Sequence, residues 1–152
     1  MNYNIRPMTE ADIDDVYAIE ITTHIAPWKK SIIKDCVRAG YNCLILEIQI
    51  REQRVISGYI ICREKDGYCH LLNFCIAKHF QSKGYGRKFL EYLVATISEN
   101  KEMAYIILEV RPSNKTAVHL YESFGFKINK IKKAYYTDNE FIEDAIVFKK
   151  NL

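Results

Sequence analysis

Residues 81–87 read Gln-Ser-Lys-Gly-Tyr-Gly-Arg, a stretch with two glycines between segments of different pattern. The segment before it, Tyr68 to Ala77, is rich in β-branched, aromatic and apolar residues and predicts a strand. Apolar residues at helical spacing follow it: Phe89, Leu90, Leu93, Val94 and Ile97. They predict a helix that begins near Gly86. The stretch is therefore expected to be a loop between a strand and a helix.

This loop has the composition of a pyrophosphate site. Gly84 and Gly86 let the backbone approach an anion closely, and successive N–H groups can form a concave nest. The start of the following helix adds partial positive charge, and Lys83 and Arg87 add formal charge. The loop lacks the Gly-Lys-Ser/Thr of a Walker motif and the third glycine of a Rossmann fingerprint. A helix N-terminus with convenient glycines is the alternative.

A carboxylate lies inside the next predicted strand, Met103 to Arg111. Carboxylates are unusual in strands. Alternation places Glu109 on the same face as Ile107 and Arg111, so its surroundings are partly apolar. We expect desolvation to raise the pKa of Glu109 and to suit it to proton transfer near neutral pH. The alternative is a Glu109 that pairs with Arg111 or lies at the edge of the sheet.

A further helix is predicted from Asn114 to Phe124, with Gly125 just past its end. Ser113 or Asn114 can cap this helix. Tyr121 comes two helical turns after Asn114, so both side chains can project toward one ligand. The alternative is a capping residue and a tyrosine of the core, which spacing alone favours over a catalytic phenol.

The whole chain predicts an α+β domain with the order β-α-α-β-β-β-α-β-α-β-β. Thr9 and Asp12 have capping-box spacing at the start of the first helix, and Gly40 is a plausible stop for the second. The other strands are predicted at residues 3–6, 43–50, 55–63, 127–136 and 141–149. Turns are predicted at 51–54, at Asp66-Gly67 and at Asp138-Asn139.

Length and composition predict one ordinary globular domain over residues 1–152. Hydrophobic residues make up 49% and charged residues 27%, which excludes disordered, collagenous and disulfide-scaffold classes. A net charge of +3 is too small to indicate nucleic acid or membrane as an obligate partner. A secretory signal is not recognisable, and no apolar run approaches the ~18 residues of a membrane span. We expect a soluble intracellular protein.

The cysteines and histidines indicate neither a metal nor a redox site. Five cysteines are present, an odd number without C-x-x-C spacing, and most lie in apolar runs. Four histidines are scattered without metal-ligand spacing. Reduced, structural thiols predict a cytoplasmic location.

In this order and spacing, the motifs resemble the GCN5-related N-acetyltransferase (GNAT) superfamily over most of the chain. Q-x-x-G-x-G at residues 81–86 matches its acetyl-CoA pyrophosphate loop, and S-N-x-x-A-x-x-L-Y-E-x-x-G-F at residues 113–126 matches its later cofactor motif. The resemblance implies the GNAT fold, a mixed and mostly antiparallel sheet flanked by helices on both faces. It also implies acetyl-CoA as co-substrate and no metal.

Several segments are similar to the RimI-type ribosomal-protein alanine N-acetyltransferases. They are Leu108 to Asn114, Leu120-Tyr121-Glu122, Pro27-Trp28 after His24, Tyr135-Tyr136 and Glu143-Asp144-Ala145. That family acetylates the N-terminal alanine of protein eighteen of the small ribosomal subunit. This chain departs from it at Lys78-His79, where the family has a more acidic turn, and at Thr137, where it often has proline.

The resemblance also implies a role for individual residues. Backbone groups of Phe74, Cys75 and Ile76 would hold the pantetheine arm, and Asn114 would bond the cofactor arm. The pyrophosphate would be held by Ser82, Lys83, Gly84, Tyr85, Gly86 and Arg87. Glu109 would be the general base, through water, and Tyr121 would protonate the departing thiolate. No covalent intermediate is required, so Cys75 is not expected to be a nucleophile.

The acceptor implied is the N-terminal peptide of a ribosomal protein. A free α-amine, with a pKa of about 7.7–8.0, asks less of a general base than a lysine with a pKa of about 10.4. Trp28, Tyr135 and Tyr136 are expected to line the peptide groove, unless Trp28 and one tyrosine belong to the core. An arginine after the alanine would need a carboxylate. The candidates are Glu20, Glu143 and Asp144.

Two other functions compete with this prediction. One is an acetyltransferase for a small amine such as a polyamine or an aminoglycoside, which a strongly acidic pocket would favour. The other is a non-catalytic acetyl-CoA-binding module or an RNA-binding protein that uses Lys127, Lys130, Lys132 and Lys133, although a solvated strand face is the favoured interpretation of these lysines. The presence of both Glu109 and Tyr121 argues against a dead enzyme. A monomer or weak dimer is expected.

Overall fold

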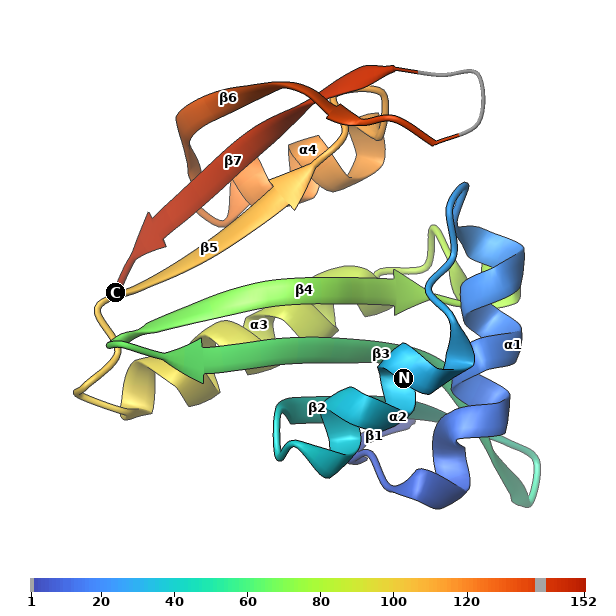
Figure 1. The fold of residues 1–152 in the computed structure, drawn as a ribbon. Helices are drawn as coiled ribbons and strands as arrows, with labels where there is room; N and C mark the ends of the chain where they lie inside the picture. Colours follow the sequence, from blue (N-terminus) through green and yellow to red (C-terminus); the bar gives the residue numbers. More distant parts are fainter. Residues whose placement is uncertain (1, 139–141) are drawn as a thin grey trace. The chain divides into compact units, whose positions relative to one another are not determined.

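The computed structural model describes residues 2–138 and 142–152 (Figure 1). Its strands are β1 (Tyr3–Pro7), β2 (Asn42–Ile50), β3 (Gln53–Lys65), β4 (Tyr68–Ile76), β5 (Tyr105–Val110), β6 (Lys127–Tyr136) and β7 (Glu143–Asn151). Its helices are α1 (Ile13–Thr23), α2 (Lys30–Arg38), α3 (Tyr85–Glu99) and α4 (Lys115–Ser123), with short 3-10 turns at Glu10–Asp12 and Lys78–Phe80. The strand order is β1-β2-β3-β4-β5-β7-β6.

The chain divides into two compact units. Unit 1 comprises Met1–Arg63 and Leu72–Thr96, and unit 2 comprises Glu64–Leu71 and Ile97–Leu152. The strands β3 and β4 and the helix α3 contribute residues to both. Each unit is described by itself below.

Unit 1 carries the strands β1 to β3 and the second half of β4. β1 and β3 both pair antiparallel with β2. The hairpin between β2 and β3 is confirmed, but its turn is tighter than the predicted tetrad. The residue Arg51 adopts a left-handed backbone with φ 56°, so β3 resumes at Gln53.

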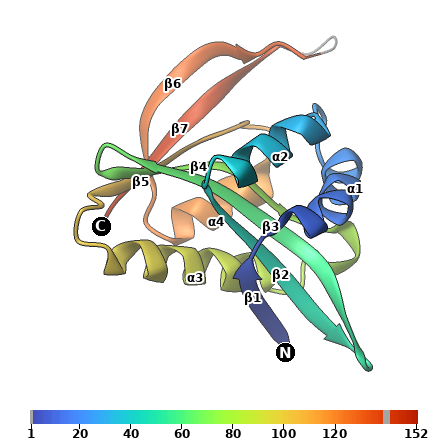
Figure 2. The ribbon, with the colours of Figure 1, turned by 60° about the horizontal axis from the view of Figure 1, so that its bottom comes forward.

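Helices cover both faces of the unit 1 strands (Figure 2). Side chains that alternate on β2, among them Cys43 and Ile45, pack against α1 and α2 in a core with Val16 and Ile33. The opposite face receives α3, whose Phe89, Leu90 and Leu93 are fully buried. Alternation along the strands therefore fills two apolar layers at once, which explains why β2 and β3 read as nearly continuous apolar runs.

The helix boundaries follow the predicted signals with one difference. The Thr9 N–H donates to Asp12 Oδ2 at 2.8 Å, as a capping box requires. The first turn is nevertheless a 3-10 turn, and α1 begins only at Ile13. The carboxylate of Asp12 also receives two hydrogen bonds from Arg6 on β1, at 2.7 and 2.8 Å, which ties this turn to the strand.

Unit 2 begins at Glu64 and contains the turn Asp66-Gly67, where both residues have positive φ. The first residues of β4 pair parallel with β5, while β7 pairs antiparallel with both β5 and β6. Burial alternates along β5, with Ile106, Leu108 and Val110 buried. Glu109 therefore lies on the opposite face, as predicted.

The predicted fold class, α+β with a mostly antiparallel mixed sheet and helices on both faces, is confirmed. The predicted element order is also observed, and the two 3-10 turns come in addition. β7 begins at Glu143 within the described residues, and the predicted strand start at Phe141 and turn residue Asn139 lie outside them. In the part of the chain that the structure describes, no helix is long and apolar enough to cross a membrane.

Candidate active site

Two strands of unit 2, β4 and β6, place basic side chains beside Glu109 on β5. Glu109 on β5 has a side chain only 12% exposed. His70 on β4 approaches it through Nε2, 2.8 Å from Oε2 and 3.1 Å from Oε1. The ammonium group of Lys132 on β6 donates to Oε1 at 3.5 Å. The half-buried carboxylate thus has two basic neighbours that come from positions far apart in the sequence.

The expected direction of the Glu109 pKa shift is wrong. Desolvation does raise the pKa, and it is the largest single cause. The hydrogen bond with His70 and the charges of His70 and Lys132 act in the other direction, and together they hold the Glu109 pKa below its ordinary value of 4.5. Glu109 is therefore ionised at neutral pH and ready to accept a proton, although its affinity for that proton is low.

One of the two alternatives for Glu109, the pairing with Arg111, is excluded. Arg111 does not pair with it, because the guanidinium group binds Asp138 and, at 3.4 Å, Glu143. In the strand order β5 lies between β4 and β7, but its pairing with β4 ends at His70 and Ile107. Glu109 pairs with Val147 of β7 and lies beyond the end of the β4–β5 pairing. His70 and Lys132 were missed as site residues. A histidine in the middle of an apolar strand was the one available signal for His70.

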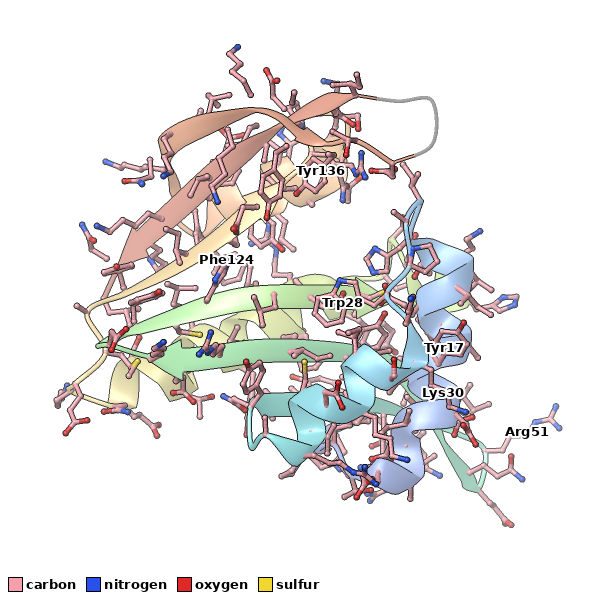
Figure 3. All side chains as sticks on the ribbon, in the orientation of Figure 1. Tyr17, Trp28, Lys30, Arg51, Phe124 and Tyr136 are labelled. Atoms are coloured by element: carbon pink, nitrogen blue, oxygen red, sulfur yellow. The ribbon has the colours of Figure 1, made fainter. Side chains whose placement is uncertain are left out.

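The predicted tyrosine pair lies at the end of β6, where Figure 3 labels Tyr136. The rings of Tyr135 and Tyr136 meet edge to face with centres 5.0 Å apart. Tyr135 is 48% exposed and lies under the ammonium group of Lys132, 4.8 Å from the ring centre. Tyr136 is partly buried, and this burial, together with the negative charge of Glu109, raises its pKa to about 12. Unit 2 thus brings both tyrosines to the surroundings of Glu109.

At α4, Asn114 and Tyr121 have the structural roles that were considered as alternatives, a helix cap and a tyrosine of the core. The side chain of Asn114 caps the helix by accepting from the Ala117 N–H at 3.3 Å. Tyr121 is 7% exposed, and its ring packs on Phe126 and Phe148 at centre distances of 5.5 and 6.1 Å. This packing fixes the phenol, and a fixed phenol is what a positioned proton donor needs.

Unit 1 holds the glycine-containing loop. The Gln81 side chain donates to the carbonyl of Ile76 at 2.8 Å, which ties the loop to the end of β4. Ser82 and Gly84 have positive φ values of 62° and 89°, and α3 begins directly afterwards at Tyr85. The first N–H groups of a helix have no partner inside it and can bind an anion. This geometry fits a pyrophosphate group.

The end of β4 is shaped by a close approach of β3. A Cβ added at Gly58 would lie 2.7 Å from the carbonyl oxygen of Cys75, so only glycine fits. Phe74 packs edge to face on Phe89 of α3, and the buried Cys75 thiol lies 2.9 Å from the Thr23 hydroxyl. Burial raises the pKa of the Cys75 thiol, which does not suit a nucleophile. Gly58 was missed, although a lone glycine in a strand is a known signal of close backbone approach.

Trp28 lies on the connection between α1 and α2 (Figure 3), where Glu20 fixes its backbone. The carboxylate of Glu20 is 1% exposed and accepts from the Trp28 N–H at 3.0 Å. It also accepts from Asn73 at 2.8 Å and from the hydroxyl of Tyr59. The side chain of Trp28 is partly buried and packs against the unit 1 core.

The three carboxylates considered for an acceptor arginine all have internal partners. Glu20 is saturated as described, and Glu143 accepts from the Ser113 N–H and hydroxyl at 2.9 and 3.0 Å. Asp144 accepts from the Ala134 N–H at 2.9 Å and from Lys133 at 3.2 Å. None of them forms an open acidic pocket.

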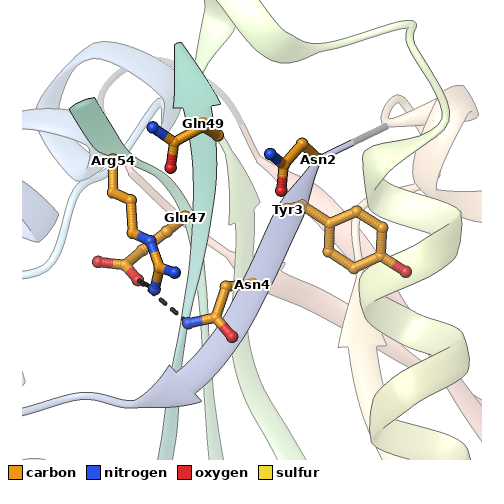
Figure 4. Close-up of a pocket in the computed structure, with 6 residues that line it drawn as sticks. All are labelled: Asn2, Tyr3, Asn4, Glu47, Gln49 and Arg54. Carbon is orange, nitrogen blue, oxygen red and sulfur yellow. Dashed lines mark hydrogen bonds and ion pairs between the residues drawn. The ribbon is translucent and has the colours of Figure 1, made fainter. Parts of the chain in front are cut away.

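A hollow elsewhere in unit 1 contains none of the predicted site residues (Figure 4). Polar side chains line it: Asn2, Tyr3, Asn4, Glu47, Gln49 and Arg54. Glu47 there already binds Asn4 at 3.2 Å and Arg6 at 3.1 Å. Among the described residues, no group of three or more histidine, cysteine or acidic side chains is arranged to hold a metal ion.

Known proteins match this architecture along most of the chain. The sequence model of the acetyltransferase (GNAT) family matches residues 12–126. The [ribosomal protein bS18]-alanine N-acetyltransferase of Haemophilus ducreyi is 32% identical over 132 residues, 87% of this chain and 88% of that protein. The crystal structure of the ribosomal-protein-S18-alanine N-acetyltransferase of Escherichia coli superposes with a TM-score of 0.87 at 28% identity, covering 98% of this chain and 93% of that one.

The fold by itself is shared with enzymes for other amines. The spermidine/spermine N-acetyltransferase of Vibrio cholerae superposes with a TM-score of 0.82 at 17% identity, covering 99% of this chain and 94% of that one. The resemblance to GNAT enzymes and to the RimI type is confirmed by sequence as well as by structure. The chain belongs to the acetyltransferase (GNAT) family and is an N-acetyltransferase.

Proposed function

We propose that this protein acetylates the N-terminal alanine of a small-subunit ribosomal protein, with acetyl-CoA as the donor. The half-buried, ionised Glu109 beside His70, Lys132 and the two tyrosines carries the proposal, since it combines a base with an aromatic surface. The relatives that match nearly the whole chain bear the name of this activity. The alternative acceptor, a polyamine, is disfavoured because the groups around Glu109 are basic and repel a polycation.

Glu109 and Tyr121 have separate proton-transfer roles in this proposal. Glu109 takes the proton of the α-ammonium group through a water molecule, and the free amine then attacks the acetyl carbonyl carbon. The C–N bond forms as the C–S bond breaks, and Tyr121 gives its phenolic proton to the departing thiolate. The second proton, which the nitrogen loses as the amide forms, restores the Tyr121 phenol through water. A weakly basic carboxylate suffices because an α-amine is already partly neutral near pH 7.5.

The donor is held by unit 1 in this proposal. The loop Ser82 to Arg87 and the N-terminus of α3 bind the pyrophosphate, while backbone groups of Phe74, Cys75 and Ile76 hold the pantetheine arm. Asn114 of unit 2 hydrogen-bonds the cofactor arm through the side-chain hydrogen-bonding groups that its capping bond to the Ala117 N–H does not use. Trp28, Tyr135 and Tyr136 contact the acceptor peptide. The free, buried thiols suit action in the reducing cytoplasm. The proposed oligomeric state is a monomer or weak dimer.

An acetyl-transfer assay tests the proposal. The acceptors are a hexapeptide that begins Ala-Arg-Tyr, the same peptide with a blocked N-terminus, and a panel of polyamines, and product mass locates the acetyl group. We expect transfer only to the free N-terminus. Glu109→Gln and Tyr121→Phe should each lower kcat by about 10²-fold or more, while calorimetry shows acetyl-CoA binding retained.

The matched control is Glu91→Gln, an exposed carboxamide substitution on α3 that should leave kcat unchanged. Turnover of polyamines without any turnover of the peptide would refute the proposed acceptor and leave the family assignment intact. Binding of acetyl-CoA without transfer to any amine would refute the catalytic roles of Glu109 and Tyr121.

A further inference from the structure

Arg111 holds the end of the β6–β7 hairpin at which the two strands are connected, through three contacts. It follows directly after β5, and its side chain is only 15% exposed. One guanidinium nitrogen donates to Asp138 beyond the end of β6, and the other donates to Glu143 at the start of β7 at 3.4 Å. The guanidinium carbon lies 4.1 Å from the ring centre of Tyr136. We call these four residues, Arg111, Tyr136, Asp138 and Glu143, the hairpin clasp.

The clasp lies beyond an irregularity in the backbone pairing of the hairpin. Tyr136 and Glu143 are paired residues at the end of the β6–β7 ladder. The register shifts between Lys132 and Tyr136, and Ala134 within this irregularity has a positive φ of 48°. A strand end beyond such an irregularity has few ladder hydrogen bonds to hold it. The side-chain contacts of Arg111 therefore decide where Tyr136 stays.

Glu143 connects the same clasp to the start of α4. It accepts from the N–H and the hydroxyl of Ser113 at 2.9 and 3.0 Å, one residue before the capping residue Asn114. Both strands of the hairpin are thus tied to the connection between β5 and α4. Lysine could not replace Arg111 here, because it lacks the planar fork that reaches two carboxylates while stacking on a ring.

From this geometry we infer that Arg111 is a positioning residue for the acceptor. It holds Tyr136, and through it Tyr135, in the place where they contact the acceptor, and it takes no part in acetyl transfer itself. The inference rests on the proposed function in assigning acceptor contact to the two tyrosines. The competing role for Arg111 is electrostatic: its charge lies two residues from Glu109 and could alter the base.

Steady-state kinetics separate these two roles. The variants are Arg111→Gln, which removes the charge and the fork, and Arg111→Lys, which keeps the charge and removes the fork. Arg63→Gln is the matched control, since Arg63 is an exposed arginine over the ring of Tyr41 in unit 1. We expect both Arg111 variants to raise the KM for the peptide about tenfold, with kcat and the KM for acetyl-CoA within about threefold of the wild type. The control should change neither.

Three outcomes would overturn the inference. A peptide KM that stays at the wild-type value in Arg111→Gln would show that the clasp does not position the acceptor. A normal KM in Arg111→Lys beside a raised KM in Arg111→Gln would show that only the charge matters. A fall in kcat with a shifted acid limb of the pH profile would mean that Arg111 acts through Glu109.

Amide hydrogen exchange without any acceptor tests the clasp independently of the proposed function. In Arg111→Lys we expect faster exchange at Tyr135, Tyr136 and Glu143 than in the wild type, with α3 unchanged. If the wild-type protein acetylates a small amine instead of the peptide, the proposed function fails. The KM for that amine in the Arg111 variants then decides the inference, since an unchanged value refutes it.

Discussion

Glu109 owes its charge state to its neighbours rather than to its exposure. Burial alone would favour the protonated form, and the side chain is only 12% exposed. The contact with His70 at 2.8 Å outweighs burial, and Lys132 adds to it. A carboxylate with a lowered pKa accepts a proton readily only from a group whose own pKa is close to neutral. An α-ammonium group, with a pKa of about 7.7–8.0, is such a group.

Removing His70 should therefore change the pH dependence of catalysis. In His70→Gln the largest cause that lowers the Glu109 pKa is lost, so we expect the pKa to rise. The acid limb of the kcat/KM profile for the peptide should move to higher pH. A limb that stays in place or moves to lower pH would contradict the assignment of Glu109 as the base.

The same variant should change stability in one pH range only. Because the folded-state pKa of Glu109 is lowered, its stabilising contribution is present above its ordinary value of 4.5 and is lost as pH falls through the lowered pKa. Urea unfolding at pH 6 should show His70→Gln to be less stable by about 1.5 kcal/mol, as for a hydrogen bond to a charged group. The two proteins should converge near pH 3. Equal differences at both pH values would mean that packing, not this pair, causes the loss.

At the scale of elements, the contact between β3 and β4 shapes the strand end that is proposed to hold the donor. Gly58 permits β3 to approach the carbonyl of Cys75. Next to it, the Ala77 N–H donates to the carbonyl of Ser57 at 2.8 Å, which keeps the two strands together as β4 ends. The loop that follows is tied to the same place by Gln81 and Ile76. A change in β3 is therefore transmitted to the path of β4.

Gly58→Ala should disturb this strand end without touching any catalytic group. The added methyl group would lie 2.7 Å from a backbone oxygen, so β4 must shift. We expect the KM for acetyl-CoA to rise severalfold and the free energy of unfolding to fall by about 1–3 kcal/mol. Steady-state kinetics with varied acetyl-CoA, supported by calorimetry of acetyl-CoA binding, measure the first effect, and urea unfolding measures the second.

The neighbouring Ser57→Ala is the control, since it removes an atom at a fully buried position instead of adding one. It should lower stability slightly and leave the KM for acetyl-CoA unchanged. Normal acetyl-CoA binding by Gly58→Ala would show that the backbone of residues 74–76 does not hold the donor.

For the molecule as a whole, the cysteines serve packing. All five are free and buried, and they are distributed over both units. Burial raises the pKa of the Cys36 and Cys75 thiols and that of Cys43 to about 12. A thiol in this state reacts slowly because the thiolate is the reactive form.

A thiol reagent should therefore report the integrity of the whole fold. We expect the native protein to react with dithiobis-nitrobenzoate at least about 10²-fold more slowly than the denatured protein, in which all five cysteines react. Lys101→Cys places a sixth thiol in an exposed turn and supplies the rate of an accessible group. A native cysteine that reacts at that rate would disprove the structural interpretation of the thiols.

The sequence by itself determined the succession of elements and the fold class, because alternation in β5, helical spacing in α3 and α4, and the turn Asp66-Gly67 are local signals. It also determined the family, because two motifs keep their order and spacing. The predicted roles of Tyr121, Asn114 and the loop at Ser82 to Arg87 stay predictions for the assays above, as does the single-domain assignment.

Only the tertiary structure decided the surroundings of the Glu109 carboxylate and of the tyrosine pair. His70 and Lys132 meet Glu109 because β4 and β6 come from distant parts of the chain, and no local pattern encodes that meeting. For the same reason the pKa of Glu109 moved opposite to the direction that burial alone predicts. Arg111 binds Asp138 and Glu143 of the β6–β7 hairpin rather than the nearby Glu109 on β5. Local pattern fixes which face a side chain occupies, whereas charge balance depends on which strands become neighbours.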